Sequence, residues 1–143
     1  MEIRFENKVA FITGAAGGIG YAAARMFAEA GASVVMVDLN GQITDRAKEL
    51  EAEGHDAIGI RCDVSDEAQV KAAVEKAVAV FGKLDIAYNN VGIHAAVRED
   101  LAETEGWDFD WVISVNLRGV WNCMKYELVE MKKHGKGAIV NCS

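Results

Sequence analysis

Short apolar runs alternate along the chain with longer segments of helical periodicity, and this alternation restricts the possible folds more than any other feature. The apolar runs are residues 9–13, 33–37, 57–60, 84–87 and 138–140. Continuous runs of this length are typical of strands that are buried on both faces of a parallel sheet. A repeat of strand, helix and strand forces parallel pairing with right-handed crossovers. The pattern therefore predicts an α/β fold, with helices on both faces of a doubly wound parallel sheet.

We expect amphipathic helices between these strands. The helix after the first strand carries apolar residues at spacings of three and four: Ile19, Ala22, Ala23, Met26, Phe27 and Ala30. The helix after the third strand repeats the pattern at Val70, Ala73, Val74, Ala77, Val78 and Phe81. A longer helical stretch, from about residue 105 to residue 134, has Trp111, Val115, Val120, Met124, Leu128 and Met131 on its apolar side. These faces are predicted to be the buried ones.

The composition favours a single globular domain over residues 1–143. Hydrophobic residues make up 51% of the chain and charged residues 26%, which is ordinary for a globular protein. A net charge of −7 opposes binding to nucleic acid, because neutralising phosphates requires a surplus of Lys and Arg. No apolar run approaches the roughly 18 residues of a membrane span, and the N-terminus does not have the pattern of a signal peptide. We therefore expect a cytoplasmic protein without a nucleic-acid or membrane partner.

The spacing of cysteines and histidines does not indicate a metal site. The cysteines, Cys62, Cys123 and Cys142, lie far apart in the sequence and have no CxxC spacing. The histidines do not pair with them at intervals typical of zinc sites. We expect free thiols in a reducing compartment, and no bound metal.

A glycine-rich turn follows the first strand and leads directly into a helix. Residues 13–20 read Thr-Gly-Ala-Ala-Gly-Gly-Ile-Gly. Such a turn brings backbone N–H groups and the positive end of the helix to a pyrophosphate, and glycine leaves the space for that approach. The predicted cofactor-binding residues here are Gly14, Gly17, Gly18, Ile19 and Gly20. The alternative is a tight turn that binds no ligand.

An acidic residue, Asp38, ends the second strand about twenty residues after the glycine-rich turn. At this position a carboxylate accepts hydrogen bonds from the ribose hydroxyls of a dinucleotide and repels a 2′-phosphate. No Lys or Arg occurs at Ala15, Ala16, Leu39 or Asn40 to bind that phosphate. The sequence therefore favours NAD over NADP, while a solvated Asp at a strand end is the alternative.

At these residues the sequence resembles the short-chain dehydrogenase/reductase family, whose glycine motif TGxxxGIG matches residues 13–20. Further family signatures follow in order: Asp63-Val64, Asn89-Asn90-Val91-Gly92, Asn116 in the long helix, and residues 139–143 as the fifth strand. Together they span nearly the whole chain. The resemblance implies the N-terminal, cofactor-binding portion of a classical member of this family, with a Rossmann-type sheet truncated after the fifth strand.

The resemblance also implies roles for single residues in cofactor binding. Asp63 is expected to accept from the adenine amino group while the Val64 amide completes the contact with the base; a helix-capping acid is the alternative for Asp63. Asn90 is expected to approach the adenosine ribose with its backbone, and Gly92 to allow close approach of the cofactor. Asn89 is expected to tie neighbouring strands together.

Asn116 is the one residue of this chain for which the resemblance implies a catalytic role. The family uses this position to hold a water that links an active-site lysine to solvent. An amide on an apolar helix face needs a hydrogen-bond partner, so a buried Asn with a purely structural bond is the alternative.

The serine, tyrosine and lysine that carry the family's chemistry lie at or after the fifth strand. Ser143 matches the first serine of the family's pair, whereas the catalytic residue is the second. The tyrosines cannot substitute: Tyr21 lies in the first helix, Tyr88 within the fourth strand, and Tyr126 late in the long helix without the family's Lys four residues on. We therefore expect a piece of a longer protein, inactive on its own, with apolar surface left open where later helices pack.

The function favoured by the sequence is an NAD-dependent oxidoreductase that interconverts a small-molecule alcohol and a ketone or aldehyde. Because the long helix is apolar on more than one side, a homodimer or homotetramer is expected for the complete protein. The alternative is a non-catalytic NAD-binding or interaction module. Another doubly wound nucleotide binder, such as a methyltransferase, is disfavoured by the Asn90 and Asn116 signatures.

Overall fold

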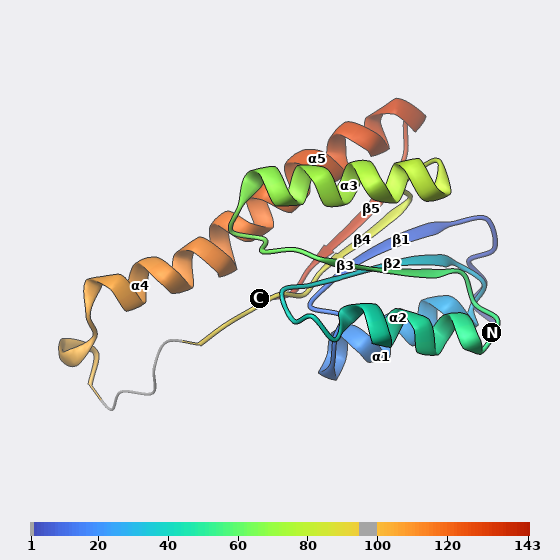
Figure 1. Cartoon of the computed structure of the whole chain (residues 1–143). Coiled ribbons are helices and arrows are strands. Elements are labelled where there is room, and N and C mark those ends of the chain that lie inside the picture. The colour runs from blue at the N-terminus through green and yellow to red at the C-terminus, as the bar shows by residue number, and fades with distance from the viewer. Residues whose placement is uncertain (1, 95–99) are drawn as a thin grey trace.

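A parallel sheet forms the centre of the molecule in a computed structural model that describes residues 2–94 and 100–143. Its strands are β1 (Val9–Thr13), β2 (Ser33–Asp38), β3 (Ala57–Arg61), β4 (Ile86–Asn89) and β5 (Ala138–Asn141). They lie in the order β3-β2-β1-β4-β5, and each neighbouring pair is parallel. The order runs outward in both directions from β1, which confirms the predicted doubly wound parallel sheet (Figure 1).

Helices cover both faces of this sheet. They are α1 (Gly18–Glu29), α2 (Ile43–Ala52), α3 (Glu67–Phe81), α4 (Gly106–Ile113) and α5 (Gly119–His134), with a 3-10 turn at Leu101–Glu103. Helices α1 and α2 lie on one face, and α3 and α5 on the other (Figure 1). A π-helical segment, Ser114–Arg118, joins α4 to α5, so that the expected long helix is one continuous stretch.

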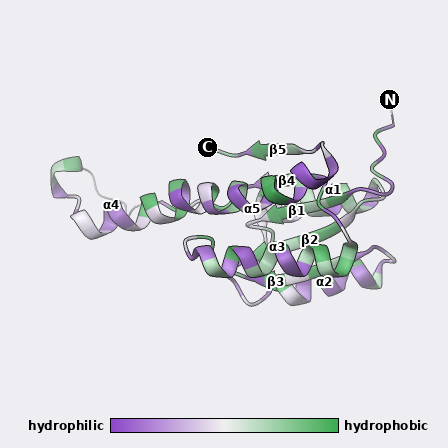
Figure 2. Cartoon of the chain, turned by 90° about the horizontal axis from the view of Figure 1, so that it is seen from above, coloured by the Kyte–Doolittle hydropathy of each residue, from purple (hydrophilic) through white to green (hydrophobic). Residues whose placement is uncertain are grey.

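Alternate side chains of the central strands pack into two separate hydrophobic cores, one on each face of the sheet. Along β1, Ala10 and Ile12 belong to the cluster that includes Leu50 of α2, whereas Phe11 belongs to the cluster that includes Val74 of α3. Because successive side chains of a strand point to opposite faces, a strand between two helical layers must be apolar at every position. In Figure 2 the strands are accordingly coloured hydrophobic along most of their length.

The buried face of α1 differs from the predicted one. Ile19 and Met26, which were expected to pack inward, are each 70% exposed, while the buried residues are Gly20, Ala24 and Ala28. A Cβ atom on Gly20 would lie 2.0 Å from the carbonyl oxygen of Gly14. The helix packs so closely on the loop before it that only small side chains fit between them, and closeness of approach outweighs the hydrophobicity of the larger residues. On α3 the predicted face is confirmed, because Val70, Ala73, Val74 and Ala77 are buried.

The long helix also departs from its predicted face. Trp111 and Leu128, expected on the packed side, are 49% and 43% exposed. The buried stripe of α5 consists of Gly119, Asn122, Cys123, Glu127, Glu130 and Met131. The prediction was right for Met131 and wrong for Trp111 and Leu128, because polar residues share the packed stripe.

The predicted open apolar surface is present over α4, the π-helical segment and α5. Exposed large apolar residues of these elements are Trp107, Phe109, Trp111, Ile113, Leu117, Trp121, Leu128 and Val129. Helix α4 extends beyond the edge of the sheet in both views (Figures 1 and 2). No helix in the described part of the chain is long and apolar enough to cross a membrane.

The contact at Gly20 generates a stability prediction. Gly20→Ala should lower the free energy of unfolding by about 3 kcal/mol, because the added methyl group collides with backbone. Gly17→Ala is the matched control: its backbone is extended, and a Cβ there meets nothing within 4 Å. Urea unfolding followed by circular dichroism compares the two, and equal destabilisation would contradict the close packing.

Candidate cofactor-binding site

A cleft of about 440 Å³ lies at the carboxyl ends of the strands, where the order of the sheet reverses between β1 and β4. Ligands of doubly wound sheets bind at such a switch point. Among the residues that line the cleft are the predicted Gly14, Asp38, Asp63, Val64, Asn90 and Gly92. The fold thus brings together predicted residues that follow or end four different strands.

The glycine-rich turn adopts a conformation that leaves room for a ligand against its backbone. Gly14 and Gly18 have positive φ angles of 67° and 56°, a backbone conformation that residues with a Cβ atom rarely adopt. Gly17 is the N-cap of α1 and has no side chain that caps the helix, so the first N–H groups are not covered by one. A Cβ on Gly17 or Gly18 meets nothing within 4 Å. Uncapped amides beside open space at a positive helix end fit a pyrophosphate group.

Both carboxylate oxygens of Asp38 are held by backbone N–H groups. Oδ2 accepts from Ala16 N at 3.0 Å, and Oδ1 accepts from Asn40 N at 2.9 Å. The side chain is half-buried at the mouth of the glycine-rich turn. Asp38 is therefore a fixed acceptor that ties β2 to the turn, and the alternative of a freely solvated acid does not describe it.

Asp63 is not the residue that caps α3. Its Oδ1 accepts from the backbone N–H of Ser65 at 3.0 Å and from the Ser65 hydroxyl at 2.7 Å. The cap is Asp66, whose carboxylate accepts from Ala68 N and Gln69 N. With the capping alternative removed, Asp63 is a half-buried acid on the wall of the cleft.

Thr13 fastens the ends of β1 and β4 to each other. Its buried hydroxyl oxygen accepts from Asn90 N at 3.0 Å and from Val91 N at 3.4 Å. These bonds fix the backbone of Asn90 beside Gly14. A Cβ atom on Gly14 would lie 3.1 Å from the side-chain nitrogen Nδ2 of Asn90. Sequence reasoning missed this role of Thr13, although a hydroxyl at a strand end beside the turn could have indicated it.

Asn116 engages one backbone unit with both ends of its amide. Its Oδ1 accepts from Ile93 N, and its Nδ2 donates to Ile93 O, each at 2.9 Å. The expected hydrogen bonding is present, but the side chain is exposed and not buried, because the π-helical segment carries it beyond the core. Asn116 does not line the cleft itself and holds Ile93, which does.

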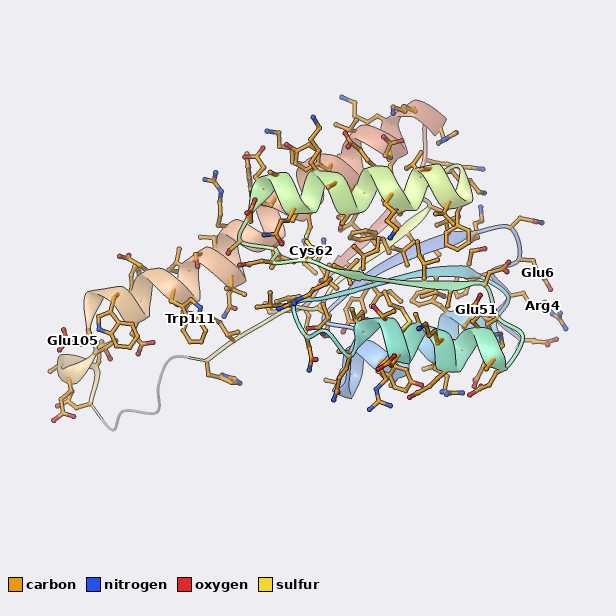
Figure 3. The ribbon with its side chains drawn as sticks, in the orientation of Figure 1. Arg4, Glu6, Glu51, Cys62, Glu105 and Trp111 are labelled. Carbon is orange, nitrogen blue, oxygen red and sulfur yellow. The ribbon has the colours of Figure 1, made fainter. Side chains whose placement is uncertain are left out.

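Trp111 of α4 is part of the wall of the cleft. It projects from α4 toward the segment that follows β4 (Figure 3) and lines the cleft together with Val115 and Ile93. The sequence placed Trp111 on the apolar side of a helix and did not assign it to the site. Helical periodicity shows that Trp111 is on an apolar face, but it does not show whether that face packs on the core or lines the cleft.

Asn89 ties β4 to its neighbours, as expected. Its buried Nδ2 donates to Asn141 Oδ1 of β5 and to Glu127 Oε2 of α5, each at 3.0 Å. Glu127 has no solvent-exposed surface. Burial raises the pKa of the Glu127 carboxyl to about 7, against the lowering effect of the hydrogen bond from Asn89. A titratable group therefore sits between the helix and the strands that end at the site.

The tyrosines are poorly suited to act as bases. Burial raises the pKa of Tyr88, and a hydrogen bond to the Glu67 carboxylate raises that of Tyr126. Tyr21 of α1 donates to Glu49 of α2. A general base needs a pKa near the working pH, so the environments of Tyr88 and Tyr126 act in the wrong direction.

The thiols and acids of the described residues do not assemble a metal site. All three cysteines are free, with Cys62 and Cys123 buried and Cys142 exposed. Burial raises the pKa of the Cys62 thiol to about 12, which keeps it protonated. Within residues 2–94 and 100–143 no group of three His, Cys, Asp or Glu side chains is placed to hold a metal ion.

Comparison with known proteins identifies the family. A family model described as short chain dehydrogenase matches residues 8–143, and the chain therefore belongs to the short-chain dehydrogenase family. It is 44% identical over 97% of its length to a cis-4-hydroxycyclohexanecarboxylate dehydrogenase of Sinomonas cyclohexanicum, of which the match covers 55%.

Two further relatives have the same extent of match. A cyclohexanol dehydrogenase of an Acinetobacter species is 42% identical over 99% of this chain and 56% of its own. The oxidoreductase UcpA of Salmonella typhimurium is 40% identical over 98% of this chain and 52% of its own. The chain spans about half the length of the curated relatives it matches.

The buried position of Glu127 generates a prediction about pH. The folded-state pKa is above the ordinary value, so the folded protein favours the protonated acid and loses stability as the pH rises from about 4.5 to above 7. Glu127→Gln removes this loss and keeps an acceptor for Asn89. Between pH 4 and pH 8 the stability of the variant relative to wild type should rise by about 3 kcal/mol.

Glu75→Gln is the control, because Glu75 is exposed on α3 and forms an ion pair with Lys71 of the same helix. Urea unfolding at several pH values measures the difference. A Glu127→Gln profile parallel to that of wild type would contradict the raised pKa.

Proposed function

We propose that the chain is the cofactor-binding portion of an NAD-dependent oxidoreductase that interconverts an alcohol and a ketone or aldehyde. The observation that carries this proposal is the Asp38 carboxylate, fixed by Ala16 N at the mouth of the glycine-rich turn and lining the cleft. A fixed acceptor beside a turn with open backbone amides matches the ribose and the pyrophosphate of a dinucleotide.

We assign the parts of the cofactor to residues that line the cleft and to the start of α1, whose residues Gly17 to Gly20 do not line it. The N–H groups at the start of α1, from Gly17 to Gly20, would hold the pyrophosphate, and Asp38 would accept from the ribose hydroxyls. Asp63 and the Val64 amide would meet the adenine ring. The Asn90 backbone, held by Thr13, and Gly92 leave room for the ribose and the part of the cofactor beyond it.

Bound NAD would supply the hydride acceptor of the reaction. This chain's own contribution is binding and orientation, because Asn116 fixes Ile93 at the cleft wall through two hydrogen bonds. Each amide atom of Asn116 retains capacity for one more bond, which supports the proposed role of holding a water. We expect the 143-residue chain to bind NAD without oxidising an alcohol, since Tyr88 and Tyr126 have raised pKa values.

The names of the relatives guide the choice of substrate class. Two of them are dehydrogenases of alcohols on a cyclohexane ring. We therefore propose a small secondary alcohol and its ketone for the complete protein, with cyclic alcohols as the first to assay. Free thiols support the proposed cytoplasmic location.

Asp38 generates the test of the cofactor. Asp38→Ala should weaken NAD binding by about 1–3 kcal/mol through loss of charged hydrogen bonds, and shift the preference toward NADP through loss of repulsion. Asp45→Ala is the control, because it removes an exposed carboxylate from the first turn of α2. Calorimetric titration of both cofactors measures the change. An unaltered NAD-to-NADP ratio would rule out the ribose contact.

A second proposal concerns association of the chain with copies of itself. The exposed apolar residues of α4 and α5 support a homodimer or homotetramer, since large exposed apolar side chains gathered on one stretch of helix favour association. The same surface favours the second candidate function, a non-catalytic NAD-binding or interaction module. Turnover of any alcohol by the complete protein would decide for the enzyme.

Matched substitutions test this surface. Val129 of α5 and Val80 of α3 are each 50% exposed, so the same change at both alters charge equally. Val129→Glu should shift sedimentation toward the monomer, because a desolvated carboxylate is costly at an interface, while Val80→Glu should not. Equal sedimentation of both variants would count against the α5 interface.

A further inference from the structure

Arg46 reaches the glycine-rich turn from a different element than Asp38. It lies in the first turns of α2, and its Nε donates to the carbonyl oxygen of Ala16 at 3.2 Å. The backbone N–H of the same residue, Ala16, donates to Asp38 Oδ2 at 3.0 Å. The Arg46 guanidinium therefore binds the carbonyl oxygen of Ala16, and the Asp38 carboxylate binds its N–H group.

The two charged groups are close but separate. Their bonded atoms are at most about 10 Å apart, because the nitrogen and the oxygen of one residue are less than about 4 Å apart. Arg46 forms its ion pair with Glu49, whose oxygens accept from Nη1 at 3.1 and 3.2 Å. Its guanidinium also lies 5.1 Å from the centre of the Tyr21 ring.

Part of the hydrogen-bonding capacity of Arg46 is unused within the described residues. The side chain is 39% exposed, and Nη2 has no hydrogen-bond partner in the described part of the chain. A planar guanidinium with a free nitrogen is the side chain best suited to bind a phosphate. The exposed flank of the turn thus carries a cation that the motif residues themselves do not supply.

We propose that Arg46 is a second determinant of cofactor choice. It is a cation that binds the ribose 2′-phosphate when the repulsion from Asp38 is removed. This inference rests on the proposed function, since it places the ribose at Asp38. A 2′-phosphate would lie beside Ala16, where the carboxylate repels it and the guanidinium attracts it. While Asp38 is present the repulsion dominates, because the carboxylate is at the hydroxyl itself and Arg46 is partly neutralised by Glu49.

One consequence separates this proposal from the simple effect of Asp38. If Asp38 acted alone, Asp38→Ala would merely remove repulsion, and NADP would bind no better than NAD. With Arg46 available, Asp38→Ala should bind NADP more tightly than NAD without any added cation. The gain should fall as salt is raised from about 50 to about 500 mM, because it depends on an exposed charge.

The experiment compares variants in the Asp38→Ala background by calorimetric titration of NAD and NADP. Adding Arg46→Gln should weaken NADP binding about tenfold and change NAD binding less than about threefold. Adding Arg46→Lys should give an intermediate NADP affinity, because the charge stays and the fork is lost. Arg25→Gln is the matched control: Arg25 also lies by the Tyr21 ring, at 5.6 Å, but pairs with Glu53 and does not reach the turn.

The outcomes separate the proposal from its premise. Equal weakening of NAD and NADP by Arg46→Gln would show a loop-holding role only, and would overturn the inference while leaving the proposed function intact. The inference would be overturned in the same way if Arg25→Gln had the effect of Arg46→Gln. Failure of wild type to bind NAD, with the chain folded by circular dichroism, would overturn the proposed function and the inference together.

Discussion

The contact of backbone with backbone between Gly14 and Gly20 is the constraint on which the site depends. With no side chain at Gly20, the first turn of α1 lies against the carbonyl of Gly14 at the end of β1. The same close packing places Gly14 and Gly20 beside the side-chain amide of Asn90. Because neither Gly14 nor Gly20 has a Cβ atom, the glycine-rich turn, helix α1 and the end of β4 can pack closely together.

Polar bonds then fix the loops that the close packing brings together. Thr13 holds the backbone after β4, Asp38 holds the glycine-rich turn, and Asn116 holds Ile93. Each of these side chains bonds to main chain rather than to another side chain. Because main-chain partners have few ways to move, such bonds set the positions of the loops more firmly than contacts between flexible side chains would.

The sequence predicted what depends on periodicity and on motifs, and failed where packing geometry decides. Strands with uniform apolar runs were located well, although β4 begins at Ile86, two residues later than expected, because Asp85 accepts from Val9 N before the ladder starts. The predicted site residues Asp38, Asp63 and Asn90 meet at one cleft because the carboxyl ends of parallel strands share an edge. The inward face of α1 was wrong since hydrophobicity does not encode how closely two backbones approach. Arg46 was missed because it is close to the turn only in space.

The polar stripe of α5 has a consequence for the geometry of the whole long helix. Asn122 donates to Val64 O, and Glu127 accepts from Asn89, on the same buried side and more than one turn apart. An apolar stripe would tolerate rotation of the helix about its axis, whereas two directional bonds at different heights permit a single angular setting. Since α4 continues α5 through the π-helical segment, that setting also aims the far end of the stretch. The two buried bonds of α5 therefore fix, from within the core, the position of Trp111 at the cleft.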